Sequence, residues 1–204
     1  MKIICIGRNY SEHIKELGND PNAEPVFFMK PDTALLPNRN HPVFYPDFTS
    51  NLHYEGELVF RISRLGKFIE PQFAHLYIDA VGFGIDFTAR DLQQECMAKG
   101  LPWEMAKSFD FSAPVDGFRP LSDFPDLNNI SFELKLNGMT VQFGNSRDMI
   151  FDIRRIIGHV SKYVTLRTGD LIFTGTPKGV GPVQKGDILE GFLEGISSIK
   201  VQVK

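Results

Sequence analysis

The chain has few cysteines, no cluster of basic residues and no long hydrophobic run. Its two cysteines, Cys5 and Cys96, lack the C-x-x-C spacing of a redox or zinc motif. They indicate neither a disulfide framework nor a zinc knuckle, and we expect a reducing, cytoplasmic location. The apolar start at 3–6 is too short for a signal sequence or a membrane span. No membrane partner is therefore expected.

The charges are balanced and scattered. The chain has 22 lysines and arginines against 25 aspartates and glutamates, a net charge of -3 at pH 7. Because the basic residues form no patch or stripe, no nucleic-acid partner is expected and small-molecule chemistry is favoured. The 204 residues, 42% of them hydrophobic, contain no linker, repeat or low-complexity tract. They predict a single domain over 1–204.

Hydrophobic patterning predicts many strands and a few helices. Strands are predicted at 3–6, 25–30, 54–62 and 77–87, in a hairpin over 131–143 that turns at Asn137-Gly138, and after the Gly-Asp turns at 169–170 and 186–187. Helices are predicted at about 12–17, 88–98 and 149–163. The middle helix would begin at a capping box formed by Thr88 and Asp91. This mixture predicts an α+β domain with a strongly curved sheet.

Three carboxylates are candidate metal ligands. Glu55 and Glu57 alternate along a predicted strand, so both project from one face. Two such carboxylates repel each other unless a cation lies between them, and a hard divalent cation takes oxygen ligands. Asp86 is the third candidate, because a charge in the apolar stretch 84–87 is expensive to bury unpaired. The alternative for the two glutamates is a solvated sheet face.

Two further groups are candidate catalytic residues. Glu16 lies one helical turn from His13 and would orient the imidazole and raise its basicity; the alternative is two exposed residues on a short helix. Lys107 lies among apolar residues and would supply a fixed positive charge near developing negative charge; the alternative is a surface lysine. The glycine-rich stretch 174–181 lacks the P-loop pattern.

Six sequence blocks, in this order, resemble the fumarylacetoacetate hydrolase family, in particular its short acylpyruvase and oxaloacetate-decarboxylase-like members. The blocks are 7–10 with His13 and Glu16, 53–58, 84–93, 99–103, 106–110 and 174–182. The resemblance covers nearly the whole chain, and six blocks in register are not expected by chance. The resemblance implies a barrel-like roll of mixed β-sheet with a few short helices.

The resemblance also implies the contents of the site. Glu55, Glu57 and Asp86 would hold Mg²⁺ or Mn²⁺, with Ca²⁺ as an inactive substitute. The oxygens of a small 2-oxo acid would bind this metal, which polarises the ketone and stabilises an enolate.

The same resemblance implies roles for four other residues. Lys107 would place positive charge beside the oxyanion, and Thr176 would hydrogen-bond the substrate carboxylate. Arg90 and Gln93 would orient the substrate.

A mobile lid helix at about 11–18 is implied as well. His13, oriented by Glu16, would deprotonate a water that attacks the distal carbonyl of an acylpyruvate, which releases pyruvate as its enolate and a carboxylic acid. The leading hypothesis is therefore a metal-dependent hydrolase of C–C bonds, with oxaloacetate decarboxylation as a second activity. An isomerase, dehydratase or decarboxylase of another 2-oxo acid, such as an aromatic ring-cleavage product, is the alternative. A metal-binding protein without turnover is a third reading.

The aromatic content bears on assembly. The chain has 18 phenylalanines, more than one core of this size commonly needs, and surplus aromatic residues suit a subunit interface. A homodimer is expected, as the resemblance also implies. A purely internal aromatic core is the alternative.

Overall fold

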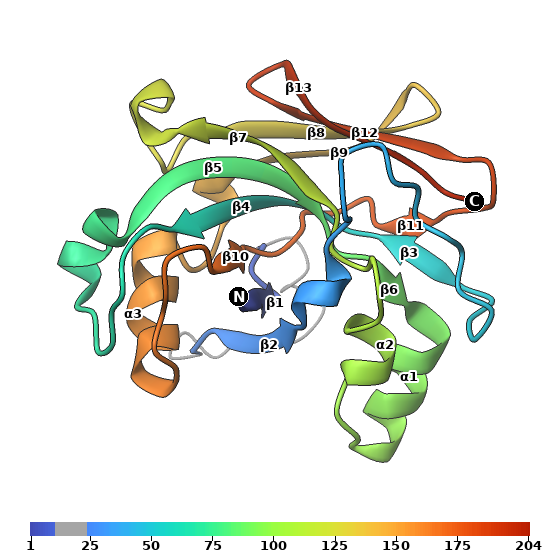
Figure 1. Cartoon of the computed structure of the whole chain (residues 1–204), viewed down its shortest axis with the longest axis horizontal. Coiled ribbons are helices and arrows are strands. Elements are labelled where there is room, and N and C mark those ends of the chain that lie inside the picture. The colour runs from blue at the N-terminus through green and yellow to red at the C-terminus, as the bar shows by residue number, and fades with distance from the viewer. Residues whose placement is uncertain (11–23) are drawn as a thin grey trace.

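Three β-sheets form the frame of the protein, in a computed structural model that describes residues 1–10 and 24–204 (Figure 1). The largest sheet has the strand order β2 (Val26–Lys30), β1 (Ile3–Gly7), β10 (Leu171–Phe173), β4 (Gly56–Ile62), β5 (Ile78–Ile85) and β7 (Val115–Pro120). β1 and β10 are parallel and the other neighbours are antiparallel, so the sheet is mixed.

The other two sheets lie against this one. A four-stranded sheet has the order β13 (Ile196–Gln202), β12 (Ile188–Leu193), β8 (Ser131–Leu136) and β9 (Met139–Asn145), and a three-stranded sheet has the order β11 (Gly181–Pro182), β3 (Leu52–Tyr54) and β6 (Thr88–Ala89). Figure 1 shows the four-stranded sheet above the long arc of β4 and β5. The described strands form a curved, open roll and do not close into one barrel. The predicted α+β class and barrel-like outline are confirmed in this form.

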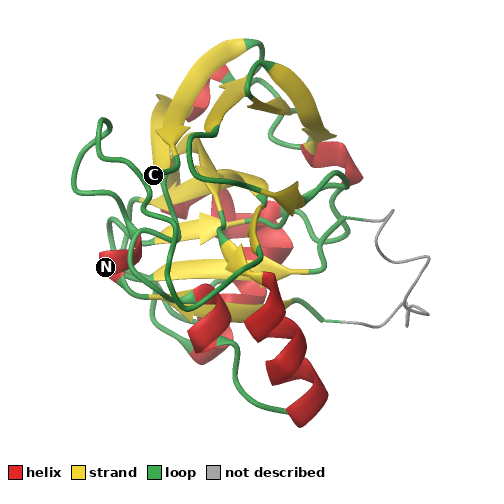
Figure 2. Ribbon diagram, turned by 90° about the vertical axis from the view of Figure 1, so that its right-hand side faces the viewer, coloured by secondary structure: helices red, strands yellow, loops and turns green. Residues whose placement is uncertain are grey.

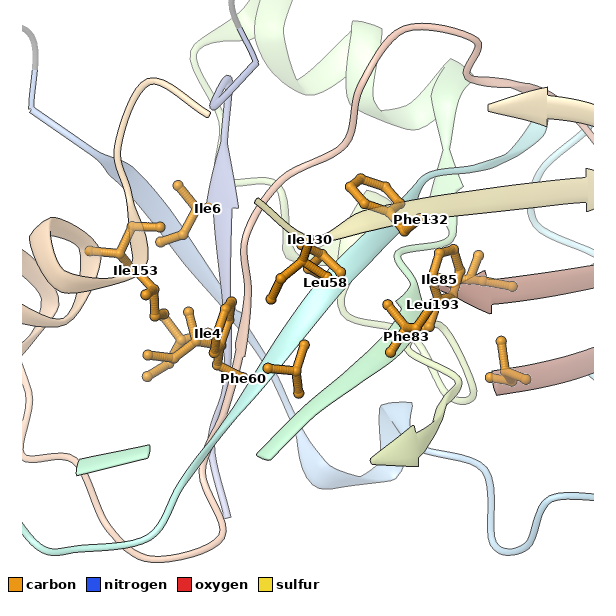
Figure 3. Close-up of a cluster of buried hydrophobic side chains, with 14 of the residues drawn as sticks. Ile4, Ile6, Leu58, Phe60, Phe83, Ile85, Ile130, Phe132, Ile153 and Leu193 are labelled. Carbon is orange, nitrogen blue, oxygen red and sulfur yellow. The ribbon is translucent and has the colours of Figure 1, made fainter. Parts of the chain in front are cut away.

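Both faces of the six-stranded sheet are buried, so its strands alternate between two cores. On β1, Ile4 and Ile6 belong to the main core, whereas Ile3 and Cys5 belong to a smaller one on the opposite face. This explains why the segment reads as a continuous apolar run. Figure 3 shows part of the main core, with Ile4, Ile6, Leu58, Phe60, Phe83, Ile85, Ile130, Phe132, Ile153 and Leu193 labelled. Full burial of such side chains contributes about 1.5–3 kcal/mol each.

Three α-helices and several 3₁₀ helices complete the described part of the chain. The α-helices are α1 (Arg90–Lys99), α2 (Glu104–Lys107) and α3 (Ile153–Tyr163), and the 3₁₀ helices are Asp32–Ala34, Pro71–Tyr77, Leu121–Asp123 and Ser146–Asp148. α3 lies at one end of the large sheet, and α1 and α2 lie at the other, extending below the sheets at the front of Figure 2. Among the described residues, no helix combines the length and hydropathy needed to cross a bilayer.

Several predicted elements differ from the structure. The strand predicted over 54–62 is two strands, β3 and β4, separated at Glu55. The helix predicted from about Met149 begins at Ile153, capped by the Asp152 carboxylate. The residues before it are held by Asn9, whose backbone oxygen and side chain accept the N–H groups of 150 and 151. The helix predicted at about 12–17 lies outside the described residues.

The predicted capping box of Thr88 and Asp91 is wrong. α1 begins after Ala89 without a side-chain cap. The Thr88 hydroxyl accepts a hydrogen bond from Lys107, and the Asp91 carboxylate accepts hydrogen bonds from the hydroxyl of Thr49 and the backbone of Ser50. The side chains of Thr88 and Asp91 therefore form hydrogen bonds with residues distant in sequence and do not cap the helix.

Candidate active site

The three predicted carboxylates lie together where β4 begins and the antiparallel β5 ends. Glu55 precedes β4, Glu57 is the second residue of β4, and Asp86 follows β5. The Asp86 N–H donates to the Glu55 carbonyl at 2.8 Å, so strand pairing continues one step past the ends of the two strands. One oxygen from each carboxylate lies within 4.8 Å of the others.

Strand alternation places these side chains on one face. Glu57 lies two residues before Val59, which belongs to the smaller core, so both point away from the main core. On the neighbouring strand β5, Gly84 pairs with Glu57, and a Cβ at Gly84 would lie 2.4 Å from the Phe173 ring. The absence of a side chain at Gly84 therefore allows Phe173 to pack beside the carboxylates.

Two buried lysines neutralise part of this charge. The Nζ of Lys107, on α2, donates to Glu55 at 2.8 Å, to Asp86 at 2.8 Å and to the Thr88 hydroxyl at 2.6 Å. Its side chain is 3% exposed, so the surface alternative is excluded. Lys30, at the end of β2, lies 2.7 Å from the Oδ1 of Asp86, whereas Lys107 contacts its Oδ2, and the side chain of Lys30 is 0% exposed. Asp86 is therefore held between two ammonium groups.

Arg90 and Gln93 form a second layer at the start of α1. The Arg90 guanidinium donates to Glu55 at 2.5 Å and to the Gln93 side-chain oxygen at 2.5 Å. Both residues also line the cleft. The structure thus brings the predicted substrate-orienting pair to the site, where it also fixes one of the carboxylates.

The pKa values follow from burial and from these partners. Burial alone raises the pKa of Glu55, but the charges of Lys107 and Arg90 outweigh it and hold that pKa at about 2. Burial lowers the pKa of Lys107, but Asp86 and Glu55 outweigh this effect and raise it above its ordinary value. Burial raises the pKa of Glu57 well above its usual range, and the charges of Asp86 and Glu55 raise it further. Glu57 is therefore the carboxylate that most lacks a cation.

The donor set fits a hard divalent cation. Mg²⁺ and Mn²⁺ take carboxylate oxygens, and the cluster offers three. Among the described residues Glu57 makes no ion pair, and its carboxylate accepts the Gly175 N–H at 2.7 Å. Asp86 Oδ1 lies near Lys30 but accepts no well-oriented hydrogen bond within the described chain. A cation bound by Glu55, Glu57 and Asp86 would satisfy both groups.

A cleft of about 280 Å³ opens onto the carboxylates. Its apolar wall includes Phe28, Met97 and Trp103, and the rings of Phe28 and Trp103 meet edge to face with centroids 6.1 Å apart. Arg8 also lines it, with a left-handed backbone (φ 58°) that is uncommon for arginine. The cleft has room for a small organic acid.

Thr176 lies in the cleft, but its hydroxyl is already used. It donates to the Gly56 carbonyl at 2.9 Å and accepts from Gln142 at 2.8 Å. A hydroxyl has one proton, so Thr176 donates to a substrate carboxylate through this group only if the bond to Gly56 is exchanged. His13 and Glu16 lie outside the described residues, so their predicted roles remain predictions.

Two buried residues at the site were not predicted. Lys30 ends a short apolar strand and is followed by Pro31, a position where a lysine is expected to reach solvent, so nothing in the sequence signals its burial. Gln142 lies in a hairpin strand and is buried. The groups that Lys30 and Gln142 contact lie far from these two residues in the sequence.

A curved mixed-sheet roll that holds three buried carboxylates and two buried lysines at a small cleft defines a metal-dependent enzyme. The family model described as fumarylacetoacetate (FAA) hydrolase C-terminal matches residues 2–204. The chain belongs to the fumarylacetoacetate hydrolase family, as its sequence blocks predict.

Individual relatives cover almost the whole chain. The mouse protein named oxaloacetate tautomerase FAHD1, mitochondrial, is 45% identical over 202 residues, 99% of this chain and 91% of the relative. A Dictyostelium discoideum protein named oxaloacetate decarboxylase, mitochondrial, is 40% identical over 97% of this chain and 90% of the relative. The crystal structure of fumarylpyruvate hydrolase from Pseudomonas aeruginosa, in complex with Mn²⁺ and pyruvate, is 36% identical with a TM-score of 0.92, covering 100% of this chain and 89% of that one.

Proposed function

We propose that this enzyme catalyses enolate-forming reactions of oxaloacetate, as a tautomerase and decarboxylase. The observation that carries the proposal is the cluster of three carboxylates, flanked by buried lysines, at the base of a small cleft. A divalent cation held there would polarise the 2-oxo group and offset the charge of an enolate. The names of the mouse and Dictyostelium relatives support oxaloacetate as the substrate.

The charge at the site suits a dianion. Lys30, Lys107 and Arg90 balance the three carboxylates in number, so a bound divalent cation leaves a positive excess. Oxaloacetate carries two carboxylates, which match this excess. Lys107 uses its three N–H groups on Glu55, Asp86 and Thr88, so it acts on the substrate through its charge, which is weakly screened where it is buried.

Hydrolysis of acylpyruvates is the second candidate. It is supported by the similarity to fumarylpyruvate hydrolase from Pseudomonas aeruginosa. It also needs an activated water, for which His13 and Glu16 are the predicted residues. Decarboxylation needs no water, because loss of CO₂ gives the pyruvate enolate directly.

One assay separates the candidates. EDTA-treated protein is supplied with Mn²⁺, Mg²⁺ or Ca²⁺ and incubated with oxaloacetate, acetylpyruvate or fumarylpyruvate. Enol absorbance, diketone absorbance and pyruvate are followed. We expect Mn²⁺- and Mg²⁺-dependent loss of the oxaloacetate enol and release of pyruvate, and no turnover with Ca²⁺. Cleavage of acylpyruvates alone would favour the second candidate, and no turnover of any of these acids would refute both.

We also propose that the enzyme is a homodimer. A groove of about 1000 Å³ is lined by Met1, Phe48 and Met105, each more than half exposed. Such exposed apolar side chains are typical of subunit interfaces. Light scattering during size exclusion should give twice the 23.1 kDa chain mass, and the mass of one chain at micromolar concentration would contradict the proposal.

A further inference from the structure

Gln142 reaches the active site from a different sheet. It lies on β9, in the four-stranded sheet, and is 2% exposed. Its side-chain oxygen accepts the Gly56 N–H at 2.8 Å. Its amide nitrogen donates to the Thr176 hydroxyl at 2.8 Å and to the Pro177 carbonyl at 3.0 Å. One side chain therefore joins β4 to the loop over 174–181.

The two segments that Gln142 joins carry the functional groups of the site. Gly56 lies between Glu55 and Glu57, so its N–H is fixed at the centre of the pair. The loop supplies the Gly175 N–H, which donates to Glu57 at 2.7 Å. The Thr176 hydroxyl closes the connection by donating to the Gly56 carbonyl. The carboxylate pair and the loop are thus held in one network.

The backbone packing around Gln142 leaves little freedom. A Cβ on Gly56 would lie 3.2 Å from the Gln142 oxygen and 2.9 Å from the Phe83 ring. A Cβ on Gly179 would lie 2.2 Å from the Val141 carbonyl, and its φ is +97°. Glycine at these two positions allows β9 to approach both segments closely.

We propose that Gln142 is a positioning residue for the metal ligands and for the substrate loop. This inference rests on the proposed function. The amide fixes the backbone between Glu55 and Glu57, and so fixes the separation of their carboxylates. The same amide orients the Thr176 loop toward the cleft. Metal affinity and substrate binding therefore depend on one residue that touches neither metal nor substrate.

The test compares Gln142→Met with a matched core variant. Methionine fills a similar volume but makes none of the three hydrogen bonds. Leu189→Ala, on β12 of the same sheet, is fully buried and does not line the cleft. For each EDTA-treated protein, Mn²⁺ affinity is measured by calorimetry, the melting temperature is measured without metal, and kcat and KM are measured for oxaloacetate with saturating Mn²⁺.

We expect Gln142→Met to weaken Mn²⁺ binding by about tenfold or more and to raise KM for oxaloacetate more than it lowers kcat. Leu189→Ala should lower the melting temperature and leave Mn²⁺ affinity unchanged. Unchanged Mn²⁺ affinity in Gln142→Met, or an equal loss in Leu189→Ala, overturns the proposal. A wild-type protein that binds no Mn²⁺ instead overturns the proposed function.

A shorter variant keeps the test decisive if Gln142→Met does not fold. Gln142→Asn retains the amide but is one methylene shorter, so it cannot span from Gly56 to Pro177. It should weaken Mn²⁺ binding in the same direction by a smaller factor. Wild-type affinity in this folded variant also overturns the proposal.

Discussion

Replacement of Lys30 by methionine should strongly destabilise the metal-free protein. The Lys30 side chain is 0% exposed, and its ammonium lies 2.7 Å from Asp86. Removing one partner of a buried ion pair costs about 3–5 kcal/mol, because the other charge stays buried. Lys107 still neutralises Asp86 in the variant, which favours the lower end of that range. Methionine keeps most of the packing, so the loss is mainly electrostatic.

The hydrogen bonds add to this cost. Lys30 donates to the carbonyls of Phe87 at 3.2 Å and Ser112 at 2.9 Å. The Ser112 carbonyl keeps a second donor, the Phe87 N–H, so it stays satisfied. Loss of the bond to the Phe87 carbonyl adds about 1 kcal/mol. The total is about 4 kcal/mol, which corresponds to a fall in melting temperature of roughly 8–16 °C for a chain of this size.

Thermal denaturation followed by circular dichroism in EDTA measures this effect. Lys99→Met is the control, because Lys99 forms an exposed ion pair with Glu95 and its loss should not measurably change the melting temperature. If the Lys30 variant melts within about 2 °C of wild type, the substitution costs no more than about 1 kcal/mol and the buried pair does not stabilise the fold. An equal fall in both variants would also refute the reasoning.

Three further predictions concern packing and catalysis. Gly84→Ala should lower the free energy of unfolding by about 1–3 kcal/mol, measured by urea denaturation, because the new Cβ would lie 2.4 Å from the Phe173 ring; an unchanged midpoint would show that the ring moves freely. His13→Ala should lower kcat for acylpyruvate hydrolysis by about 10²–10⁴-fold and spare oxaloacetate decarboxylation, and equal losses in initial-rate assays would contradict its role in activating water. Arg90→Lys should raise KM for oxaloacetate roughly tenfold, because lysine cannot hold Glu55 and Gln93 together; an unchanged KM would remove Arg90 from substrate binding.

The parts of the fold that local patterns determine were predicted from the sequence. The hairpin turns at Asn137 and Gly138, which have φ of 51° and 81° as the dipeptide requires. Alternation along the chain placed Glu55 and Glu57 on one face, although β4 begins only at Gly56, after Glu55. These features depend on neighbours in sequence, so the sequence alone specifies them.

The missed features depend on contacts between distant segments. Lys30 is paired with Asp86, and Gln142 is bonded to Gly56 and Thr176, none of which any local pattern connects. A buried lysine at the end of an apolar strand, or a glutamine in a hairpin, reads as an ordinary surface residue until the sheets are packed. The capping box failed at Thr88 for the same reason, because Lys107 reaches it from α2.

The central claim is that Glu55, Glu57 and Asp86 bind one divalent cation per chain. Calorimetric titration of EDTA-treated protein with Mn²⁺ tests it most directly, with wild type, Glu57→Gln and the exposed control Glu95→Gln. Glutamine at 57 keeps the shape of the side chain and removes the charge, whereas Glu95 is not part of the cluster and forms an exposed ion pair with Lys99. We predict one site per chain in wild type and in Glu95→Gln, and none in Glu57→Gln. A Mn²⁺ isotherm for Glu57→Gln that matches wild type would contradict the account.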